Sequence, residues 1–160
     1  MHIVYLLLGG NIGDRIQMLQ SATIQLSERV GTILASSAMY ETAAWGKEEQ
    51  PRFLNSVLAM TTTLSASEVL TEIQTIENIY GRQRVEIWGA RTLDIDILFY
   101  DDAIIQTERL TIPHPFIQDR RFVLVPLCEI APDLQHPVLQ KTITELLAYC
   151  PDQLEVIKIN

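Results

Sequence analysis

The segment WGARTLDIDILFYDD, residues 88–102, places two carboxylates inside a stretch that is otherwise largely aliphatic. Its residues alternate from position 93 onward, which is typical of a β-strand. One face of this strand is expected to carry Leu93, Ile95, Ile97 and Phe99, and the other Asp94, Asp96, Leu98 and Tyr100. Two acids side by side in an apolar strand are unfavourable unless something offsets their charge. The pair therefore needs an explanation beyond the strand itself.

The remaining segments predict the topology around this strand. Strands are expected at 2–8, 32–44 and 53–64, and helices at 14–29 and after the capping box formed by Ser65 and Glu68. With the acidic strand last, the order β-α-β-β-α-β predicts a ferredoxin-like α+β fold, in which helices pack on an antiparallel sheet. We expect the first strand and the acidic strand side by side in the middle of that sheet. A hairpin near 103–112 and helical segments near 121–130 and 142–149 form a C-terminal extension.

The composition predicts a single soluble domain over residues 1–160. The chain is 48% hydrophobic and 20% charged, and its net charge of −8 argues against nucleic acids or anionic membranes as partners. No stretch approaches the roughly 18 apolar residues that cross a bilayer, and the first residues lack the basic start of a secretory signal. The two cysteines, Cys128 and Cys150, are too few for a disulfide framework, so we expect a reduced, cytoplasmic protein.

Asp94 and Asp96 have a spacing that suits a metal site. Side chains two apart on a strand project from one face roughly 7 Å apart. Two ionised carboxylates at that distance repel by about 2 kcal/mol. Mg²⁺ offsets this repulsion, because it prefers oxygen ligands and is usually held by carboxylates together with substrate phosphates. The alternative is an edge strand whose acids face water or pair with arginines, but Arg91, three residues upstream, favours a phosphate ligand nearby.

Several other polar and aromatic residues allow two interpretations each. Gln74 and Glu77 share one face of the second helix, which either lines a site or faces solvent. Asn55, among apolar strand residues, is either a satisfied core amide or a reader of a heterocycle's edge. His114, between two prolines, either shapes the turn or contacts a ligand. The aromatic residues that form either core or a stacking platform are Trp45, Phe53, Trp88 and Phe122.

These residues lie in motifs that resemble the 6-hydroxymethyl-7,8-dihydropterin pyrophosphokinase family. The resemblance runs nearly end to end, through LGGNIGD, YETAAWG, QPRFLN, EIQTIENIYGRQR, WGARTLDIDIL, ERLTIPHP and DRRFVLVPLCEIAPDL. The run Trp-Gly-x-Arg-Thr-Leu-Asp-x-Asp is highly specific to that family. The resemblance implies an enzyme of folate synthesis that transfers pyrophosphate from ATP to the hydroxymethyl group of a dihydropterin and releases AMP.

The resemblance also implies roles for individual residues. The catalytic residues would be Arg82, Arg91, Asp94 and Asp96, with the two acids holding two Mg²⁺ ions. ATP, the co-substrate, would be bound by Gln74, Glu77, Arg84, Arg91, Ile97, Arg109, Thr111, His114 and Arg120. The pterin would be bound by Thr42, Ala43, Trp45, Phe53, Asn55, Trp88, Asp94 and Phe122. The implied partners are these two small molecules, and the implied assembly is a monomer or a small homo-oligomer.

The sequence departs from the family pattern at a few positions. Ile87 and Phe116 stand where arginine is frequent, and the segment that starts at Arg82 is one residue short. The acids, Arg91 and Asn55 are unchanged, so these departures indicate tuning of the activity. Two other functions stay open: another Mg²⁺-dependent phospho- or nucleotidyltransferase on a ferredoxin-like sheet, and a binding module without catalysis.

Overall fold

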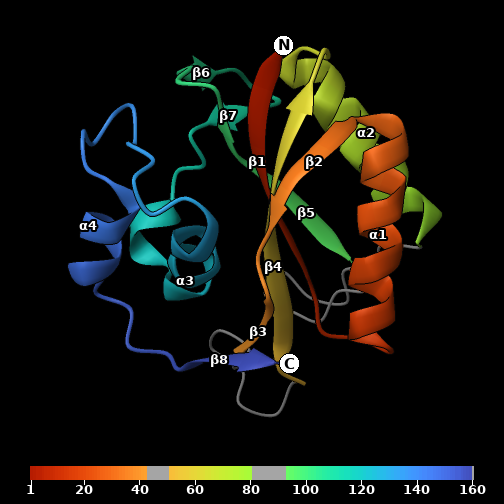
Figure 1. The fold of residues 1–160 in the computed structure, drawn as a ribbon. Helices are drawn as coiled ribbons and strands as arrows, with labels where there is room; N and C mark the ends of the chain where they lie inside the picture. The colour runs from red at the N-terminus through yellow and green to blue at the C-terminus, as the bar shows by residue number, and fades with distance from the viewer. Residues whose placement is uncertain (43–50, 81–92, 160) are drawn as a thin grey trace.

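The computed structural model describes residues 1–42, 51–80 and 93–159 (Figure 1). Its strands are β1 (His2–Gly10), β2 (Gly31–Ser36), β3 (Met39–Thr42), β4 (Phe53–Thr62), β5 (Asp94–Tyr100), β6 (Ile105–Gln106), β7 (Thr111–Ile112) and β8 (Val156–Ile159). Its helices are α1 (Arg15–Arg29), α2 (Ala66–Ile79), α3 (Arg121–Ile130) and α4 (Ile143–Ala148), with a 3-10 turn, η1, at Ile117–Asp119. No helix in these described ranges is long and apolar enough to cross a membrane.

The main sheet is antiparallel and has the strand order β5-β1-β4-β3-β8, with β2 also paired to β4. The predicted α+β class and the pairing of β1 with β5 are confirmed, and the β-α-β-β-α-β order holds when β2 and β3 are counted as the one strand expected at 32–44. The expectation that β5 lies in the middle of the sheet is wrong. Among the described strands β5 lies at the end of the order, because β1 already fills the place next to β4 and β5 can pair only on its far side.

Two further strand predictions differ from the structure. The strand expected at 32–44 is two strands, because Ser37 turns inward between them. Its hydroxyl accepts a bond from the Val57 N–H at 2.9 Å and donates to the Ala38 carbonyl at 2.7 Å. The sequence analysis also missed β8, which adds to the edge of β3 near the C-terminus. The hairpin of β6 and β7 and the helices α3 and α4 are confirmed.

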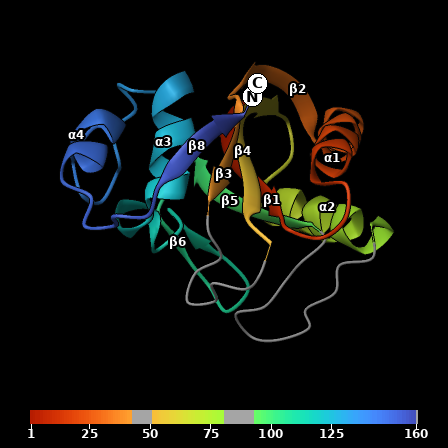
Figure 2. The ribbon, with the colours of Figure 1, turned by 90° about the horizontal axis from the view of Figure 1, so that it is seen from below.

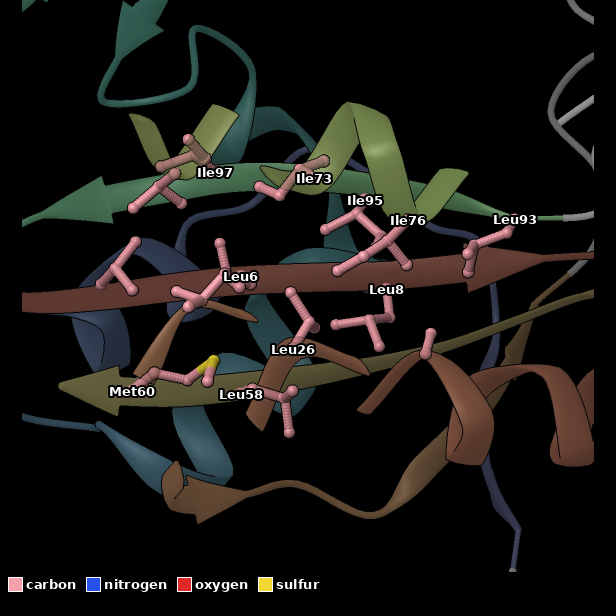
Figure 3. Packing of buried hydrophobic residues seen from close by; sticks show 14 of the residues in the cluster. Leu6, Leu8, Leu26, Leu58, Met60, Ile73, Ile76, Leu93, Ile95 and Ile97 are labelled. Atoms are coloured by element: carbon pink, nitrogen blue, oxygen red, sulfur yellow. The ribbon is translucent and has the colours of Figure 1, made fainter. Parts of the chain in front are cut away.

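The sheet carries one hydrophobic cluster on each face, covered by α1 and α2 on one side and by α3 and α4 on the other (Figure 2). The cluster under α1 and α2 (Figure 3) includes Leu6, Leu8, Leu26, Ile73 and Ile76. The cluster under α3 and α4 includes Leu7, Val57, Phe99, Leu124 and Ile143. Within β5, Asp94 and Asp96 are the two residues that are not fully buried. The polar positions of β5 therefore gather where the strand begins.

A bulge interrupts the alternation that the sequence predicts for β5. Leu6 pairs with Ile97 and Tyr5 pairs with Phe99, so Leu98 is an extra residue in the ladder. As a result Phe99 joins Leu98 in the cluster under α3, and Tyr100 turns to the cluster under α2. The predicted faces are thus correct for 93–98 and wrong for Phe99 and Tyr100. The acids precede the bulge, so their common face is unaffected.

We predict that Ser65→Ala lowers the free energy of unfolding by about 1 kcal/mol, because it removes one half of the capping box of α2. The Ser65 hydroxyl accepts from the Glu68 N–H at 3.2 Å, and the Glu68 carboxylate accepts from the Ser65 N–H at 2.9 Å. Urea unfolding measures the loss, with Thr63→Ala, an exposed change just outside the helix, as the control. Equal stability of the two variants would contradict the assignment.

Candidate active site

The candidate site is built on the face of the sheet that α3 covers. Gly9 of β1 pairs with Asn55 of β4 on one side and with Asp94 of β5 on the other. Directly paired residues of antiparallel strands project from the same face, so Asn55 and Asp94 lie in one row across Gly9. Two strand spacings separate their Cα atoms, roughly 10 Å. A strand amide and a strand carboxylate thus face one side of the sheet at opposite ends of a short row.

The rows on either side of this one carry further residues expected at the site. Asp96 projects beside Asp94 and pairs with Leu7, while Thr42 of β3 pairs with Phe53 of β4, two residues before Asn55. The structure therefore brings together five of the residues expected at the site: Thr42, Phe53, Asn55, Asp94 and Asp96. Within the described ranges no group of three or more His, Cys, Asp or Glu side chains has a metal-binding arrangement. The donor set on this face is the pair of carboxylates.

Asn55 is buried, with 5% of its surface exposed. Its side-chain amide makes no hydrogen bond in the part of the chain that the structure describes, and its polar atoms are not among the fully buried ones that lack a partner there. The amide therefore offers a donor and an acceptor to a ligand, and its role in ligand binding stays a prediction.

His114 lies close to Asp94 and is fixed by two backbone bonds. The backbone N–H of His114 donates to the Leu98 carbonyl at 3.1 Å, and the ring nitrogen Nδ1 accepts from the backbone N–H of Phe116 at 3.3 Å. The pKa of His114 is lowered to about 4, mainly by burial and also by the charge of Arg120, while the charge of Asp94 acts in the opposite direction. The ring is therefore neutral at pH 7 with its proton on Nε2.

Glu77 and the backbone of His114 occupy the outer edge of β5. The Oε2 of the buried Glu77 accepts a bond from the Ile95 N–H at 3.0 Å, so the carboxylate acts as an edge partner in place of another strand. Ile97, expected to contact ATP, has its side chain in the cluster under α2. Any contact that Ile97 makes with a ligand on this edge must therefore use its backbone.

Arg109 and Gln74, both expected to contact ATP, lie together. The Arg109 guanidinium donates to Gln74 Oε1 at 3.2 Å, to Thr71 Oγ1 at 2.7 Å and to Ser67 Oγ at 3.0 Å. These bonds tie the connection between β6 and β7 to the exposed side of α2. Thr111, at the start of β7, is exposed. The polar face of α2 is thus shared with the hairpin rather than simply open to solvent.

Arg120 lies between two aromatic rings at the start of α3. Its guanidinium carbon is 5.0 Å from the centre of the Phe116 ring and 5.7 Å from that of Phe122. Such cation–π contacts orient the guanidinium without neutralising its charge. Phe116, at a position where arginine was expected to be frequent, therefore helps to orient the Arg120 side chain.

Arg15 and Asn11, which the sequence analysis did not single out, bond to residues in or just before the strands that carry part of the site. Arg15, at the start of α1, donates to the Arg52 carbonyl at 2.8 Å and to Glu41 at 3.3 Å. Asn11 is buried and donates to the Pro51 carbonyl at 3.0 Å. These bonds anchor the end of β3 and the start of β4, which carry Thr42 and Phe53. The sequence signal is the motif LGGNIGD, which contains Asn11 and ends just before Arg15.

His136 is a buried histidine outside the candidate site. His136 is 5% exposed, its Nδ1 accepts from the N–H groups of Val138 and Leu139, and its ring meets that of Phe99 edge-on. Its role is structural. Six of the expected site residues lie outside the described ranges: Ala43, Trp45, Arg82, Arg84, Trp88 and Arg91.

Comparison with known proteins gives consistent matches over most of the chain. A family model described as 7,8-dihydro-6-hydroxymethylpterin-pyrophosphokinase (HPPK) matches residues 5–132. A protein of Aquifex aeolicus named 2-amino-4-hydroxy-6-hydroxymethyldihydropteridine pyrophosphokinase is 44% identical over 145 residues, which cover 91% of this chain and 90% of that protein. A protein of the same name from Haemophilus influenzae is 43% identical over 157 residues, covering 98% of this chain and 97% of its own.

Solved structures match the fold at lower sequence identity. The crystal structure of Plasmodium falciparum HPPK-DHPS wild type with SDX-DHP aligns with a TM-score of 0.71 and 19% identity. The alignment covers 92% of this chain and 43% of that one, so this chain spans less than half of the solved chain. A likeness at this identity shows the shared architecture, an antiparallel sheet with helices packed on it.

We predict that His114 remains neutral well below pH 6.5, because its burial disfavours the charged ring. A folded-state pKa below the unfolded value means that the unfolded chain binds the proton first. The stability that depends on the neutral ring is present above pH 6.5 and is lost as the pH falls towards 4. NMR titration of the ring carbons of His114 measures this pKa directly. A His114 pKa near 6.5 would contradict the prediction.

Proposed function

The chain belongs to the 7,8-dihydro-6-hydroxymethylpterin-pyrophosphokinase family, and we infer that it transfers pyrophosphate from ATP to the hydroxymethyl group of 6-hydroxymethyl-7,8-dihydropterin in folate synthesis. The products are the pterin diphosphate and AMP. The observation in this chain that best supports the inference is the row in which Asn55 and Asp94 face one side of the sheet across Gly9. This row suits a flat heterocycle read at one end and phosphorylated at the other.

We propose that the pterin lies along this row. Asn55 would bond to its amide edge, because a side-chain amide offers both a donor and an acceptor. Phe53 and Phe122 would lie against the two faces of the ring, and Thr42 would contact its edge, together with Ala43, Trp45 and Trp88 outside the described ranges. The hydroxymethyl group would then point towards Asp94.

ATP would lie beside β5, on the side of His114 and α2. His114, neutral and with its proton on Nε2, can donate a hydrogen bond to an anionic oxygen. Arg120 supplies a positive charge next to it. The other proposed ATP contacts are Gln74, Glu77, Ile97, Arg109 and Thr111, with Arg82, Arg84 and Arg91 outside the described ranges. This assignment places cations around the phosphates of a protein whose net charge is −8.

Asp94 and Asp96 would hold Mg²⁺, and we propose two ions. The donor set fits, because two half-buried carboxylates on one strand face offer hard oxygen ligands next to the proposed phosphate site. Bound Mg²⁺ supplies charge neutralisation at the ATP phosphates. The two acids in turn place the phosphates within reach of the pterin alcohol.

The transfer itself needs positioning more than covalent help. The hydroxymethyl oxygen forms a bond to the β-phosphorus, and the bond between that phosphorus and the oxygen bridging to the α-phosphorus breaks. AMP leaves with the bridging oxygen, and we assign the alcohol proton to Asp96 as acceptor. Excluding water prevents hydrolysis of ATP in place of transfer. We further propose that residues 1–160 act as one cytoplasmic domain, a monomer or small homo-oligomer.

A product assay tests the function against both alternatives. The purified protein is incubated with ATP, Mg²⁺ and the reduced hydroxymethylpterin, and the nucleotides are separated. AMP formed in step with pterin consumption, and lost on chelation of Mg²⁺, is the expected result. ADP in place of AMP would identify a different phosphotransferase, and ligand binding without turnover would identify a binding module.

We predict that Asp94→Asn and Asp96→Asn each reduce AMP formation at least about 100-fold, since each removes a charge that the transition state requires. Both variants should remain folded, because asparagine keeps the size and shape of the side chain that it replaces. Asp102→Asn, an exposed change just after β5, is the matched control and should leave the rate unchanged. Loss of folding with no dependence of the wild type on Mg²⁺ would contradict the site.

We predict that Asn55→Ala weakens pterin binding about tenfold or more and leaves binding of a non-hydrolysable ATP analogue within about twofold. The unfolding free energy of this variant should change little, because the lost amide makes no hydrogen bond within the described residues. Calorimetry measures both affinities on the same protein. Equal losses for the two ligands would rule out a pterin-specific role for Asn55.

A further inference from the structure

Gly9 occupies the centre of the row between Asn55 and Asp94. Its backbone does not require glycine, because among the described glycines the positive φ belongs to Gly13. Gly9 lies in the middle of a sheet, where glycine weakens a strand relative to residues with a side chain. Conformation therefore does not explain why this position has no side chain.

The space above Gly9 does explain it. A Cβ atom built on Gly9 would lie 2.3 Å from Asn55 Oδ1, which is far too close. Its next contacts, Asn55 Cγ at 3.4 Å and the Leu54 carbonyl oxygen at 3.5 Å, are at van der Waals distances. The conflict is thus confined to the end of one side chain. The Asn55 amide lies over the β1 backbone, in the space that any other residue at position 9 would fill.

We propose that Gly9 is a positioning residue for pterin recognition: its missing side chain lets the Asn55 amide lie across β1 on the side of Asp94. The inference rests on the proposed function and deepens it. With a side chain at position 9, the amide would have to rotate away from the row. A hydrogen bond that reads a heterocycle needs its atoms within about 3 Å, so a displacement of about 1 Å removes it.

Gly31 shows what a purely structural glycine of this sheet looks like. A Cβ on Gly31 would lie 1.8 Å from the Thr61 carbonyl oxygen and 2.9 Å from the Thr61 carbonyl carbon, so its conflict is with the backbone of β4. Gly31→Ala should therefore reduce stability and leave ligand preference unchanged. Gly9→Ala meets the side chain proposed to read the pterin, and the two glycines make a matched pair.

A double-mutant cycle tests the proposal on the full chain. Wild type, Gly9→Ala, Asn55→Ala and the double variant are titrated with the reduced hydroxymethylpterin in the presence of Mg²⁺ and a non-hydrolysable ATP analogue. We expect Gly9→Ala to weaken pterin binding about tenfold or more and to leave the affinity for the ATP analogue within about twofold. In the Asn55→Ala background, Gly9→Ala should have no further effect, because the amide that it displaces is gone.

Other outcomes overturn the proposal. Unchanged pterin binding in Gly9→Ala, an additive loss in the double variant, or equal losses for both ligands would each do so. If Gly9→Ala unfolds, the double variant is expected to recover stability, because Asn55→Ala removes the amide oxygen that conflicts with the new Cβ atom. A double variant that stays unfolded would also contradict the proposal. A wild type that binds no pterin would overturn the proposed function itself, which separates that failure from a failure of Gly9.

Discussion

The register of β1 against its two neighbours is the constraint on which the site depends. β1 pairs with β4 along its whole length and with β5 over most of it, and these two ladders place Gly9 opposite both Asn55 and Asp94. Since side chains alternate with a period of two, a slip of one residue would turn Asp94 and Asp96 into the cluster under α2. The apolar residues that alternate with them, such as Ile95 and Leu8, make that slip costly. The core therefore determines where the chemistry sits.

The edge position of β5 has a consequence for ligand binding. An edge strand presents unpaired N–H and C=O groups, and proteins usually cover or interrupt such edges. Here Glu77 accepts from the Ile95 N–H, the His114 N–H bonds to the Leu98 carbonyl, and a bulge at Leu98 bends the strand. Two of the residues proposed to contact ATP thus also close the edge. Their placement follows from satisfying the backbone, which gives the site a rigid support at little additional cost in stability.

The sequence predicts the parts of this architecture that local patterns encode. The capping box at Ser65, the α3 segment and the shared face of Asp94 and Asp96 follow from short-range spacing and are present in the structure. What could not be predicted depends on partners distant in sequence. The edge position of β5, the bulge at Leu98, β8 and the burial of His136 are each decided by which segments pair or pack. Gly9 belongs to the same class, because its meaning depends on Asn55, a residue of another strand far along the chain.

The contrast between Gly9 and Asn55 illustrates how a site of this kind trades stability for recognition. Each is an unusual choice for a sheet interior by itself: glycine weakens a strand, and a polar amide adds little to an apolar core. Together they are complementary, because the space left by one is filled by the amide of the other. A ligand that bonds to the amide stabilises the folded chain by mass action. Both departures from a regular apolar sheet thus lie in one row and concern one interaction, while Leu7 and Val57, which pair with each other in the next row of the same face, are buried in the cluster under α3.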